Sequence, residues 1–501
     1  MFSKVVTQNA FLCFLLVVGF TTACKKNNIE PENETPVIET NNLQTPTTNR
    51  DYLTRDSIFL YAKQTYFWNV GMPSYDGFNP RQYSTNEQVV NALKRMSSNG
   101  GKDKYSFIDD GTVAGQLGGV SGDYGFSINY DASNLLRVKY VYATSPADLK
   151  GLKRSYQITK VNGKGVSRSS PSDIDNLNDA IFGTNPTISM TVLKPDGTSL
   201  DVVIERGTYN INPILYTNTY TVGAKKIGYI VFNSFTTNST SLLDSVFTKF
   251  AGNGITELIV DLRYNGGGSV ATSEAFTNLI APSSQNGRIM YTTYWTKTMQ
   301  DNQATILQNQ KFYAKGNDGI TRLYSFFDYS YKPTTAAGNQ EVFTKRGTIN
   351  SLSRVYFLVT EGTASASELL INNLKPVMDV KLIGKTTYGK PVGFFSIRID
   401  KNDLYIPQFE TKNQLDQGGY FNGMIVDKDV ADDLTKDFGD TSEKLLAQAL
   451  YYSANNVFSA LAKDNTLSST SGISRSQIDD ANKKLDHEFK GMVETRKMKF
   501  K

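Results

Sequence analysis

The sequence predicts an α/β protein in three parts, and three patterns lead to this prediction. From about Lys225 onward, apolar strands alternate with helical segments, as they do in an α/β domain. Residues 111–210 contain short alternating strands separated by turns, which indicates a β-rich domain. Residues 51–110 have a helical pattern and are expected to form a small N-terminal helical domain. The chain has 501 residues, which is long enough for several domains with cores of their own.

The composition argues against several classes of site. The net charge is only +5 and is spread along the chain, so nucleic acid is not expected as a partner. The one histidine, His487, lies in a charged C-terminal segment, and both cysteines, Cys13 and Cys24, lie within the first 24 residues. A Ser-His-Asp triad would have to recruit His487, and a Cys-His protease, a multi-histidine zinc site or a structural disulfide lacks the residues it needs. We expect no metal or cofactor, and hydrolytic chemistry would use Ser or Thr with Lys, or carboxylates.

The N-terminus has the pattern of an export signal. Lys4 precedes the apolar run Phe11–Phe20, and small residues then lead to Cys24, so residues 1–23 are expected to be a signal peptide. A cysteine at this point resembles the lipidation site of a bacterial lipoprotein, although Thr21 stands where leucine is usual. The alternative is ordinary signal cleavage that leaves Cys24 as an incidental thiol. The resemblance implies a lipoprotein of the cell envelope, on an outer membrane facing the periplasm or on the cell surface.

Residues 24–50 are rich in Asn, Thr, Glu and Pro and are expected to form a disordered tether rather than a core. The helical part begins near Asp51. Residues 84–87 (Ser-Thr-Asn-Glu) match a capping box, and the apolar residues after them share one helix face: Val89, Val90, Leu93 and Met96. We interpret an earlier aromatic cluster as core: Tyr61, Tyr66, Phe67 and Trp68.

The β-rich domain has clear strand and turn signals. Pro195-Asp196-Gly197 is typical of a hairpin turn, and residues 145–152 are expected to form a short helix that Gly151 ends. Strands are expected at these positions: Tyr124–Ile128, Leu135–Tyr140, Gln157–Val161, Thr187–Leu193 and Leu200–Ile204.

Two segments of this domain, residues 145–152 (SPADLKGL) and 160–164 (KVNGK), resemble a PDZ domain in the circular arrangement found in bacterial proteases. The resemblance implies a carboxylate-binding loop and an edge strand that take a peptide C-terminus: Tyr124, Gly125, Phe126 and Ser127. Ser155-Tyr156 departs from the Gly-Asp that is usual in the family. The alternative is a β-rich spacer that binds nothing.

A glycine-rich turn follows a buried strand in the α/β part. The apolar residues Leu258–Leu262 lead into Gly266-Gly267-Gly268, and a helix is expected from about Ser269 to Ile280. Consecutive glycines let backbone N–H groups approach a ligand, either a phosphate or a developing oxyanion. The loop lacks the Gly-Lys-Ser/Thr of a phosphate loop, and tight packing alone remains a third explanation.

A second strand-to-helix turn favours the oxyanion. The strand Val355–Thr360 leads through small residues to a helix at Leu369–Leu374, and this turn exposes a serine where backbone N–H groups and the helix dipole favour an oxyanion. A further strand at Lys381–Gly384 leads to Thr386–Lys390. Without a usable histidine, a lysine whose pKa is lowered by desolvation is the available base.

These segments together resemble the carboxy-terminal processing (tail-specific) family of serine peptidases. The shared motifs are residues 261–268 (DLRYNGGG), 362–368 (GTASASE) and 387–390 (TYGK), in order and at the family's spacing. The resemblance implies a Clp-protease/crotonase-like core of β-β-α units over residues 211–460. It also implies that Ser365 is the nucleophile, Lys390 the general base, and the N–H groups of Ala366 and Gly268 the oxyanion hole, with Gly267 as the nearby alternative.

Three neighbours of this site keep other interpretations open. Ser367 is the main rival for the nucleophile, and Glu368 is expected to order the helix start. Phe394 stands where the family commonly has a glutamine that orients the lysine. The sequence thus predicts an exported serine endopeptidase that uses a Ser-Lys dyad on unfolded or C-terminally recognised proteins. The rival is a lipoprotein scaffold that binds peptides without cutting them.

The C-terminal segment, residues 461–501, is expected to be a charged helical tail. It begins with a Ser/Thr-rich stretch and continues with a helix candidate that contains Ile478, Leu485 and His487. We interpret it as a solvated appendage with His487 exposed on the helix, and the alternative is an oligomerisation or membrane-surface helix.

Overall fold

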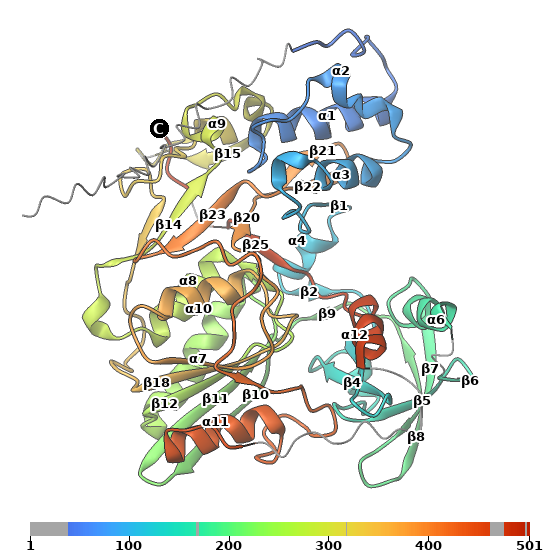
Figure 1. The fold of residues 1–501 in the computed structure, drawn as a ribbon, viewed down its shortest axis with the longest axis vertical. Coiled ribbons are helices and arrows are strands. Elements are labelled where there is room, and N and C mark those ends of the chain that lie inside the picture. Colours follow the sequence, from blue (N-terminus) through green and yellow to red (C-terminus); the bar gives the residue numbers. More distant parts are fainter. Residues whose placement is uncertain (1–38, 167–169, 317, 461–474, 496–497) are drawn as a thin grey trace, which may run out of the picture.

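The computed structural model describes residues 39–166, 170–316, 318–460, 475–495 and 498–501. The expected signal peptide, Cys24 and most of the tether lie outside these ranges, so the lipid anchor remains a prediction. Within them, no helix is both long and apolar enough to span a bilayer. Figure 1 shows a central sheet with helices on both faces, a helical cap and a separate β-rich domain.

The central sheet is mostly parallel and covered on both faces. Its first pair is antiparallel, and the remaining strands run parallel in this order: β10 (Ile214–Val222), β11 (Lys225–Phe232), β12 (Glu257–Asp261), β18 (Arg354–Val359), β19 (Val380–Gly384), β24 (Lys428–Asp429). One face packs on α7 (Ser239–Asn253), α8 (Val270–Ile280) and α10 (Ala366–Leu374), and the other packs on α11 (Lys444–Asn455). Burial on both faces explains the apolar runs Leu258–Val260 of β12 and Val355–Val359 of β18.

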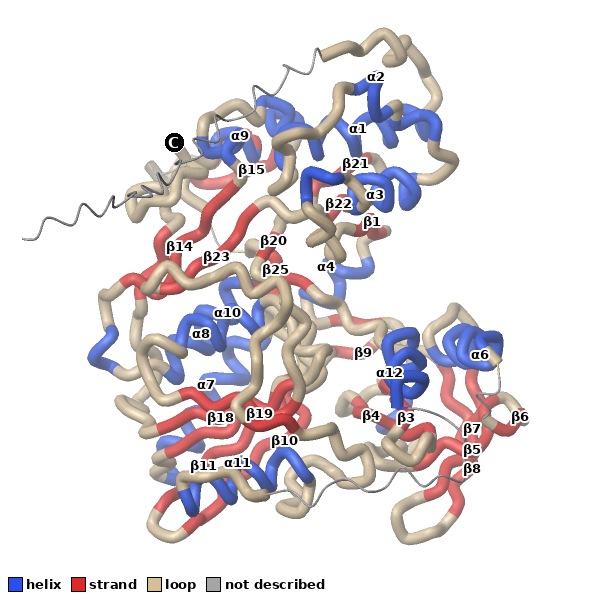
Figure 2. The backbone as a smooth tube through the Cα atoms, viewed as in Figure 1, coloured by secondary structure: helices blue, strands red, loops and turns tan. Residues whose placement is uncertain are grey.

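A second sheet and a helical cap lie beyond α8 and α10 (Figure 2). The sheet runs in the order β17 (Gln340–Val342), β14 (Ile289–Trp295), β23 (Phe409–Asn413), β20 (Val392–Gly393). The cap contains α1 (Arg50–Thr65), α2 (Tyr75–Phe78), α3 (Asn86–Lys94) and a small sheet of β1 (Phe107–Asp109), β22 (Asn402–Tyr405) and β21 (Ile397–Ile399). Smaller elements complete this half: α9 (Lys297–Gln300), β15 (Lys311–Lys315) and β16 (Thr321–Ser325).

The cap shares one continuous core with the central sheet, and Ile58, Tyr66 and Leu93 are part of it. The predicted aromatic cluster is confirmed as core for Tyr61 and Tyr66, whereas Phe67 and Trp68 are only partly buried. The capping prediction was wrong by one residue. Thr85 is the N-cap of α3 and accepts from the Gln88 N–H, while the Ser84 N–H and hydroxyl bond the Gln88 side chain.

Residues 111–210, called the accessory domain below, have a core of their own. The main sheet runs β3 (Phe126–Tyr130), β4 (Leu136–Val141), β5 (Gln157–Val161), β7 (Thr187–Leu193), β8 (Ser199–Glu205), with β6 (Lys164–Gly165) paired to β5. Helices α5 (Pro146–Leu149) and α6 (Pro171–Ile181) complete it, and α4 (Thr112–Leu117), β2 (Val120–Ser121) and β9 (Tyr209–Asn210) join it to the rest. The predicted hairpin turn is confirmed, with Gly197 at φ +84°.

The interpretation of the C-terminal segment as a solvated appendage was wrong. Helix α12 (Arg475–Lys484) packs on the accessory domain, whose core includes Ile478 and Leu485. His487 lies beyond the helix end, where its ring stacks on Phe182 at 4.2 Å between centroids. The chain then forms β25 (Gly491–Val493), which pairs in parallel with β13 (Gly267–Ser269). The apolar residues Ile478 and Leu485 of this otherwise charged segment are buried against the accessory domain, which lies far away in the sequence.

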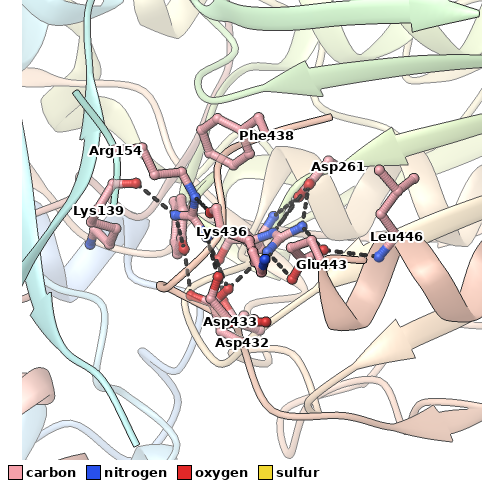
Figure 3. Close-up of polar contacts among 12 residues, drawn as sticks. Lys139, Arg154, Asp261, Asp432, Asp433, Lys436, Phe438, Glu443 and Leu446 are labelled. Carbon is pink, nitrogen blue, oxygen red and sulfur yellow. Dashed lines mark hydrogen bonds and ion pairs between the residues drawn. The ribbon is translucent and has the colours of Figure 1, made fainter. Parts of the chain in front are cut away.

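A buried ion network joins the accessory domain to the central sheet (Figure 3). Arg263, with 1% of its side chain exposed, bonds the carboxylates of Asp261, Asp432 and Glu443 at 2.7–3.1 Å. Arg154 of the accessory domain reaches the same Asp432 at 3.4 Å. Because Arg263 lies at the start of the glycine-rich loop, this network fixes the loop and the domain contact together.

Arg263→Ala is expected to lower the free energy of unfolding by about 3–5 kcal/mol, because it leaves buried carboxylates without a counter-charge. Chemical denaturation would measure the change. The matched control is Arg322→Ala, which removes an exposed ion pair with Asp318 and is expected to change stability by less than about 1 kcal/mol. Equal losses of unfolding free energy in the two variants would contradict a stabilising role for the buried ion network of Arg263.

Candidate active site

Three loops meet at one edge of the central sheet. Strands β12, β18 and β19 are adjacent and parallel, so their carboxyl ends point to the same side. The loop after β12 leads to β13, the turn after β18 leads to α10, and the loop after β19 leads to β20. Crevices at the carboxyl ends of parallel strands are common ligand sites. The three motifs found in the sequence therefore lie together in space.

Ser365 occupies a strained turn at the start of α10. Its backbone has φ +64° and ψ −110°, a region that non-glycine residues rarely adopt, at a cost of about 1–3 kcal/mol. The side chain is fully buried, and its hydroxyl has no hydrogen-bond partner among the residues that the structure describes. Strain and an unpaired buried hydroxyl together are unfavourable for stability and typical of a reactive group.

The rival Ser367 is in a different position. It is also fully buried, but its hydroxyl donates to the backbone carbonyl of Asn265 at 3.0 Å. The Asn265 side chain in turn donates to the Phe232 carbonyl at 2.8 Å and accepts from the Gly267 N–H at 2.9 Å. Ser367 and Asn265 thus hold the glycine-rich loop against α10. The structure favours Ser365 as the available hydroxyl.

Glu368 connects the turn of Ser365 with the loop of Lys390. Its carboxylate is fully buried and accepts from the N–H groups of Ser365 and Lys390, each at 2.8 Å. It also accepts from the Gly389 N–H at 2.8 Å and the Thr387 hydroxyl at 2.5 Å. Burial raises the pKa of Glu368, and these bonds to the charged form oppose the rise. The expected ordering of the helix start is only part of what this residue does.

Lys390 is fully buried in an aromatic pocket. Its Nζ lies 4.0 Å from the ring centroid of Phe394 and 5.4 Å from that of Tyr105, and it donates to the Lys490 carbonyl at 2.7 Å. Burial lowers the pKa of Lys390 well below its ordinary value, against the opposing charges of Asp103 and Glu368. Phe394, where the resembled family has a glutamine, contacts the amine through its ring instead.

The glycine-rich loop brings Gly267 and Gly268 beside the start of α10. Gly267 and Gly268 have φ +108° and +138°, which a side chain would strain. A Cβ on Gly267 would lie 2.9 Å from the Ala366 nitrogen and 2.4 Å from the Gly491 carbonyl oxygen. The Ala366 nitrogen and the Gly491 carbonyl oxygen therefore both lie next to Gly267, where a side chain would not fit. Ala366, Gly267 and Gly268 come together as the sequence analysis predicts.

The residues predicted to bind peptide lie at the start of β3, at an edge of the accessory sheet. Gly125 has φ +84° and closely approaches Ser145, while the Ser127 hydroxyl donates to Glu488 of the C-terminal segment at 3.1 Å. Tyr124, Phe126 and Ser127 line a cavity of about 390 Å³ that reaches Gly266 of the glycine-rich loop. Their role in binding a peptide stays a prediction.

The sequence analysis missed three groups at this site. Tyr105 lies in the helical cap and contacts Lys390, and Lys490 and Gly491 come from the C-terminal segment. No local pattern could have found them, because each reaches the site through a tertiary contact. Within the described ranges, no group of three His, Cys, Asp or Glu side chains could hold a metal ion.

Comparison with known proteins identifies the central part of the chain. Residues 226–431 match the model of peptidase family S41. A protein of Staphylococcus aureus (strain bovine RF122 / ET3-1) named "Probable CtpA-like serine protease" is 25% identical over 320 residues, which cover 64% of this chain and 54% of that protein. Its counterpart in Staphylococcus epidermidis (strain ATCC 35984) is 25% identical over 333 residues, 66% and 58% of the two chains. The chain thus matches little more than half the length of these relatives.

A solved structure shows the same fold. A crystal structure from Bacteroides fragilis NCTC 9343, assigned to the S41 proteases, covers 82% of this chain and 100% of its own, with a TM-score of 0.55 and 22% identity. The predicted fold class is confirmed, and so is the resemblance to the carboxy-terminal processing family.

Glu368→Gln is expected to lower the free energy of unfolding by about 2–4 kcal/mol, because an amide has one acceptor oxygen for four buried donors. Thermal or chemical denaturation would measure the loss. Glu361→Gln, an exposed position in the same turn, is the matched control and is expected to change stability by less than about 0.5 kcal/mol. A stable Glu368→Gln variant would show that the carboxylate does not hold the two segments.

Proposed function

We propose, from the premise that residues 226–431 of this chain are a peptidase family S41 domain, that the protein is a serine endopeptidase with a Ser365–Lys390 dyad. The observation that carries the proposal is the arrangement at Glu368. One carboxylate holds the backbone of a strained serine with an unpaired hydroxyl and the backbone of a buried lysine. Burial lowers the pKa of that lysine well below its ordinary value, which favours the neutral amine that a general base needs.

The mechanism follows from these positions. Neutral Lys390 takes the proton of Ser365, and the Ser365 Oγ attacks the carbonyl carbon of a bound peptide. The N–H groups of Ala366 and Gly268 stabilise the negative charge that develops on the carbonyl oxygen. Such stabilisation is usually the largest single contribution to the rate enhancement. Lys390 then gives the proton to the leaving amine, and water hydrolyses the acyl-enzyme with Lys390 again as base. An extended peptide would bind where β25 lies in this structure, paired with β13 on one side and with Phe394, next to β20, on the other.

The substrates we propose are unfolded proteins or proteins recognised by their C-termini. Tyr124, Gly125, Phe126 and Ser127 would take the terminal carboxylate, and the cavity beside them reaches the catalytic loop at Gly266. Export, the lipid anchor on Cys24 and a place in the cell envelope belong to the same proposal and rest on the first 50 residues. The second candidate, a peptide-binding scaffold, is favoured by Phe394 in place of the orienting glutamine and by Ser155-Tyr156 in place of Gly-Asp.

Ser365→Ala and Lys390→Ala are each expected to lower casein cleavage by about a thousandfold or more while leaving the fold intact. The assay uses the full chain in detergent micelles, with circular dichroism as the check of folding. Ser367→Ala is the matched control, because its hydroxyl bonds a backbone carbonyl and it is expected to retain most activity. Full activity in Lys390→Ala would contradict the dyad, and binding without cleavage by the parent would favour the scaffold.

The rate is expected to rise with pH through the ionisation of Lys390. Only the neutral amine accepts a proton, and because burial lowers the pKa of Lys390, the midpoint is expected clearly below the ordinary value of 10.5. Measuring kcat/KM for a fluorogenic peptide from about pH 5 to about pH 11 gives this midpoint for the free enzyme. A midpoint at the ordinary lysine value, or a rate that falls with rising pH over this range, would contradict Lys390 as the base.

A further inference from the structure

The C-terminal segment occupies the groove in which a substrate would bind. Residues 489–494 run as an extended strand between β13 and β20, and Figure 1 shows β25 beside β20. The Gly491 N–H donates to the Gly266 carbonyl at 3.0 Å on one side. On the other side, the Phe394 N–H donates to the Met492 carbonyl at 3.0 Å, and the Glu494 N–H donates to the Phe394 carbonyl at 2.8 Å. Backbone bonds on both edges are the way a peptide is held by strand addition.

The register places one particular carbonyl at the oxyanion site. Gly267 pairs with Gly491 in a parallel ladder, and the Gly491 N–H donates to Gly266, so the next bond in the ladder directs the Gly268 N–H at the Gly491 carbonyl. The surroundings of Gly267 give a second observation. A Cβ atom placed on Gly267 would lie 2.4 Å from the Gly491 carbonyl oxygen and 2.9 Å from the Ala366 nitrogen. One proposed oxyanion donor, the Gly268 N–H, is therefore directed at the Gly491 carbonyl, and the Ala366 nitrogen lies beside the same glycine, Gly267.

The neighbouring residues of the segment also contact the catalytic groups. Lys390 Nζ donates to the carbonyl of Lys490, one residue before Gly491. The Met492 side chain is fully buried in the main core, and Val493 packs with Phe394. The Thr495 hydroxyl bonds Ser269 at 2.6 Å. The segment thus fits the groove with its side chains as well as its backbone.

Contacts on both sides hold the segment in this register. Before the site, Asn482 of α12 bonds the backbone N–H and carbonyl of Tyr130 at 2.8 and 3.0 Å, and Glu488 forms a buried ion pair with Lys139 at 2.5 Å. After the site, the Phe500 ring stacks on Tyr324 at 3.9 Å between centroids. The chain is fixed at both ends of the groove, so the placement of Gly491 does not depend on the strand alone.

We propose that the Gly491–Met492 bond of this chain is a self-processing site and the first bond that the enzyme hydrolyses. This inference rests on the proposed function. The Ser365 Oγ bonds the carbonyl carbon of Gly491 while its proton passes to Lys390. The bond to the Met492 nitrogen then breaks, and that nitrogen takes the proton from Lys390. Water attacks the acyl carbon, one proton returns through Lys390 to Ser365, and the products are a carboxylate at Gly491 and the peptide 492–501.

Until the bond is cut, the segment excludes other substrates from the groove. A tethered segment has an effective concentration on the order of millimolar or higher, which external peptides rarely match. Cleavage of a protein substrate is therefore expected to begin after a lag that coincides with loss of residues 492–501. The cut chain retains α12 on the accessory domain, because the packing of Ile478 and Leu485 lies upstream of the bond.

The test follows the intact mass of the full chain in detergent micelles, together with casein cleavage, from the moment of purification. The parent is expected to convert to a chain that ends at Gly491, at a rate independent of protein concentration, and Ser365→Ala is expected to convert at least about a hundredfold more slowly. Gly491→Pro removes the N–H that bonds Gly266, so the segment is expected to leave the groove and the casein lag to disappear. Lys483→Ala, an exposed position of α12, is the matched control and is expected to behave as the parent.

The outcomes separate this inference from the proposed function. A parent that cleaves casein but keeps residues 492–501 overturns self-processing and leaves the peptidase intact. Cleavage of the segment at another bond overturns the register argued above. A parent that cleaves neither casein nor its own segment contradicts the peptidase itself, and the self-processing site with it.

Discussion

The site depends on one buried carboxylate, that of Glu368. A fully buried negative charge is costly unless donors satisfy it, and here four donors come from the two segments that carry Ser365 and Lys390. The bonds act on backbone N–H groups, so they fix the main chain and leave the reactive side chains free. The strained turn at Ser365 persists because this carboxylate and the start of α10 both hold it. Serine and lysine are therefore positioned through a third residue rather than through a bond to one another.

Buried charges also connect the glycine-rich loop with the accessory domain. Arg263 begins the loop that ends in Gly267 and Gly268, and its ion network includes Asp432, which Arg154 also contacts. A displacement of the accessory domain would disturb carboxylates that are buried at the root of the oxyanion loop. Buried ion pairs add little net stability, but breaking one is costly, so the network restricts the orientation of the two parts. Domain placement and loop geometry are thus coupled by charge.

The sequence was sufficient where local patterns determine structure. The motifs at Ser365 and Lys390 lie at the ends of buried parallel strands, and both the α/β class and the fold family could be predicted from them. The N-cap at Thr85 differs from the prediction because Ser84 and Thr85 can both cap, and only the side chain of Gln88 decides between them. The contact of Tyr105 with Lys390 and the strand at Gly491 could not be predicted. Both depend on contacts between residues far apart in the sequence, which local sequence patterns do not show. The sequence could not show that the Phe394 ring would contact the Lys390 amine, because that contact depends on how the loop after Lys390 folds.

The occupied groove also explains why the hydroxyl of Ser365 and the amine of Lys390 do not bond each other here. Lys390 donates to the Lys490 carbonyl, and its charge is opposed by burial and favoured by two aromatic rings. Lys490 stays on the retained chain after cleavage at Gly491, so the amine loses this acceptor only when the new C-terminal end also withdraws from the site. Loss of that bond would lower the pKa of Lys390 further, because the bond favours the protonated form. The bond to the Lys490 carbonyl therefore reduces the share of neutral Lys390 while the segment is in place, and withdrawal of the retained end would increase that share.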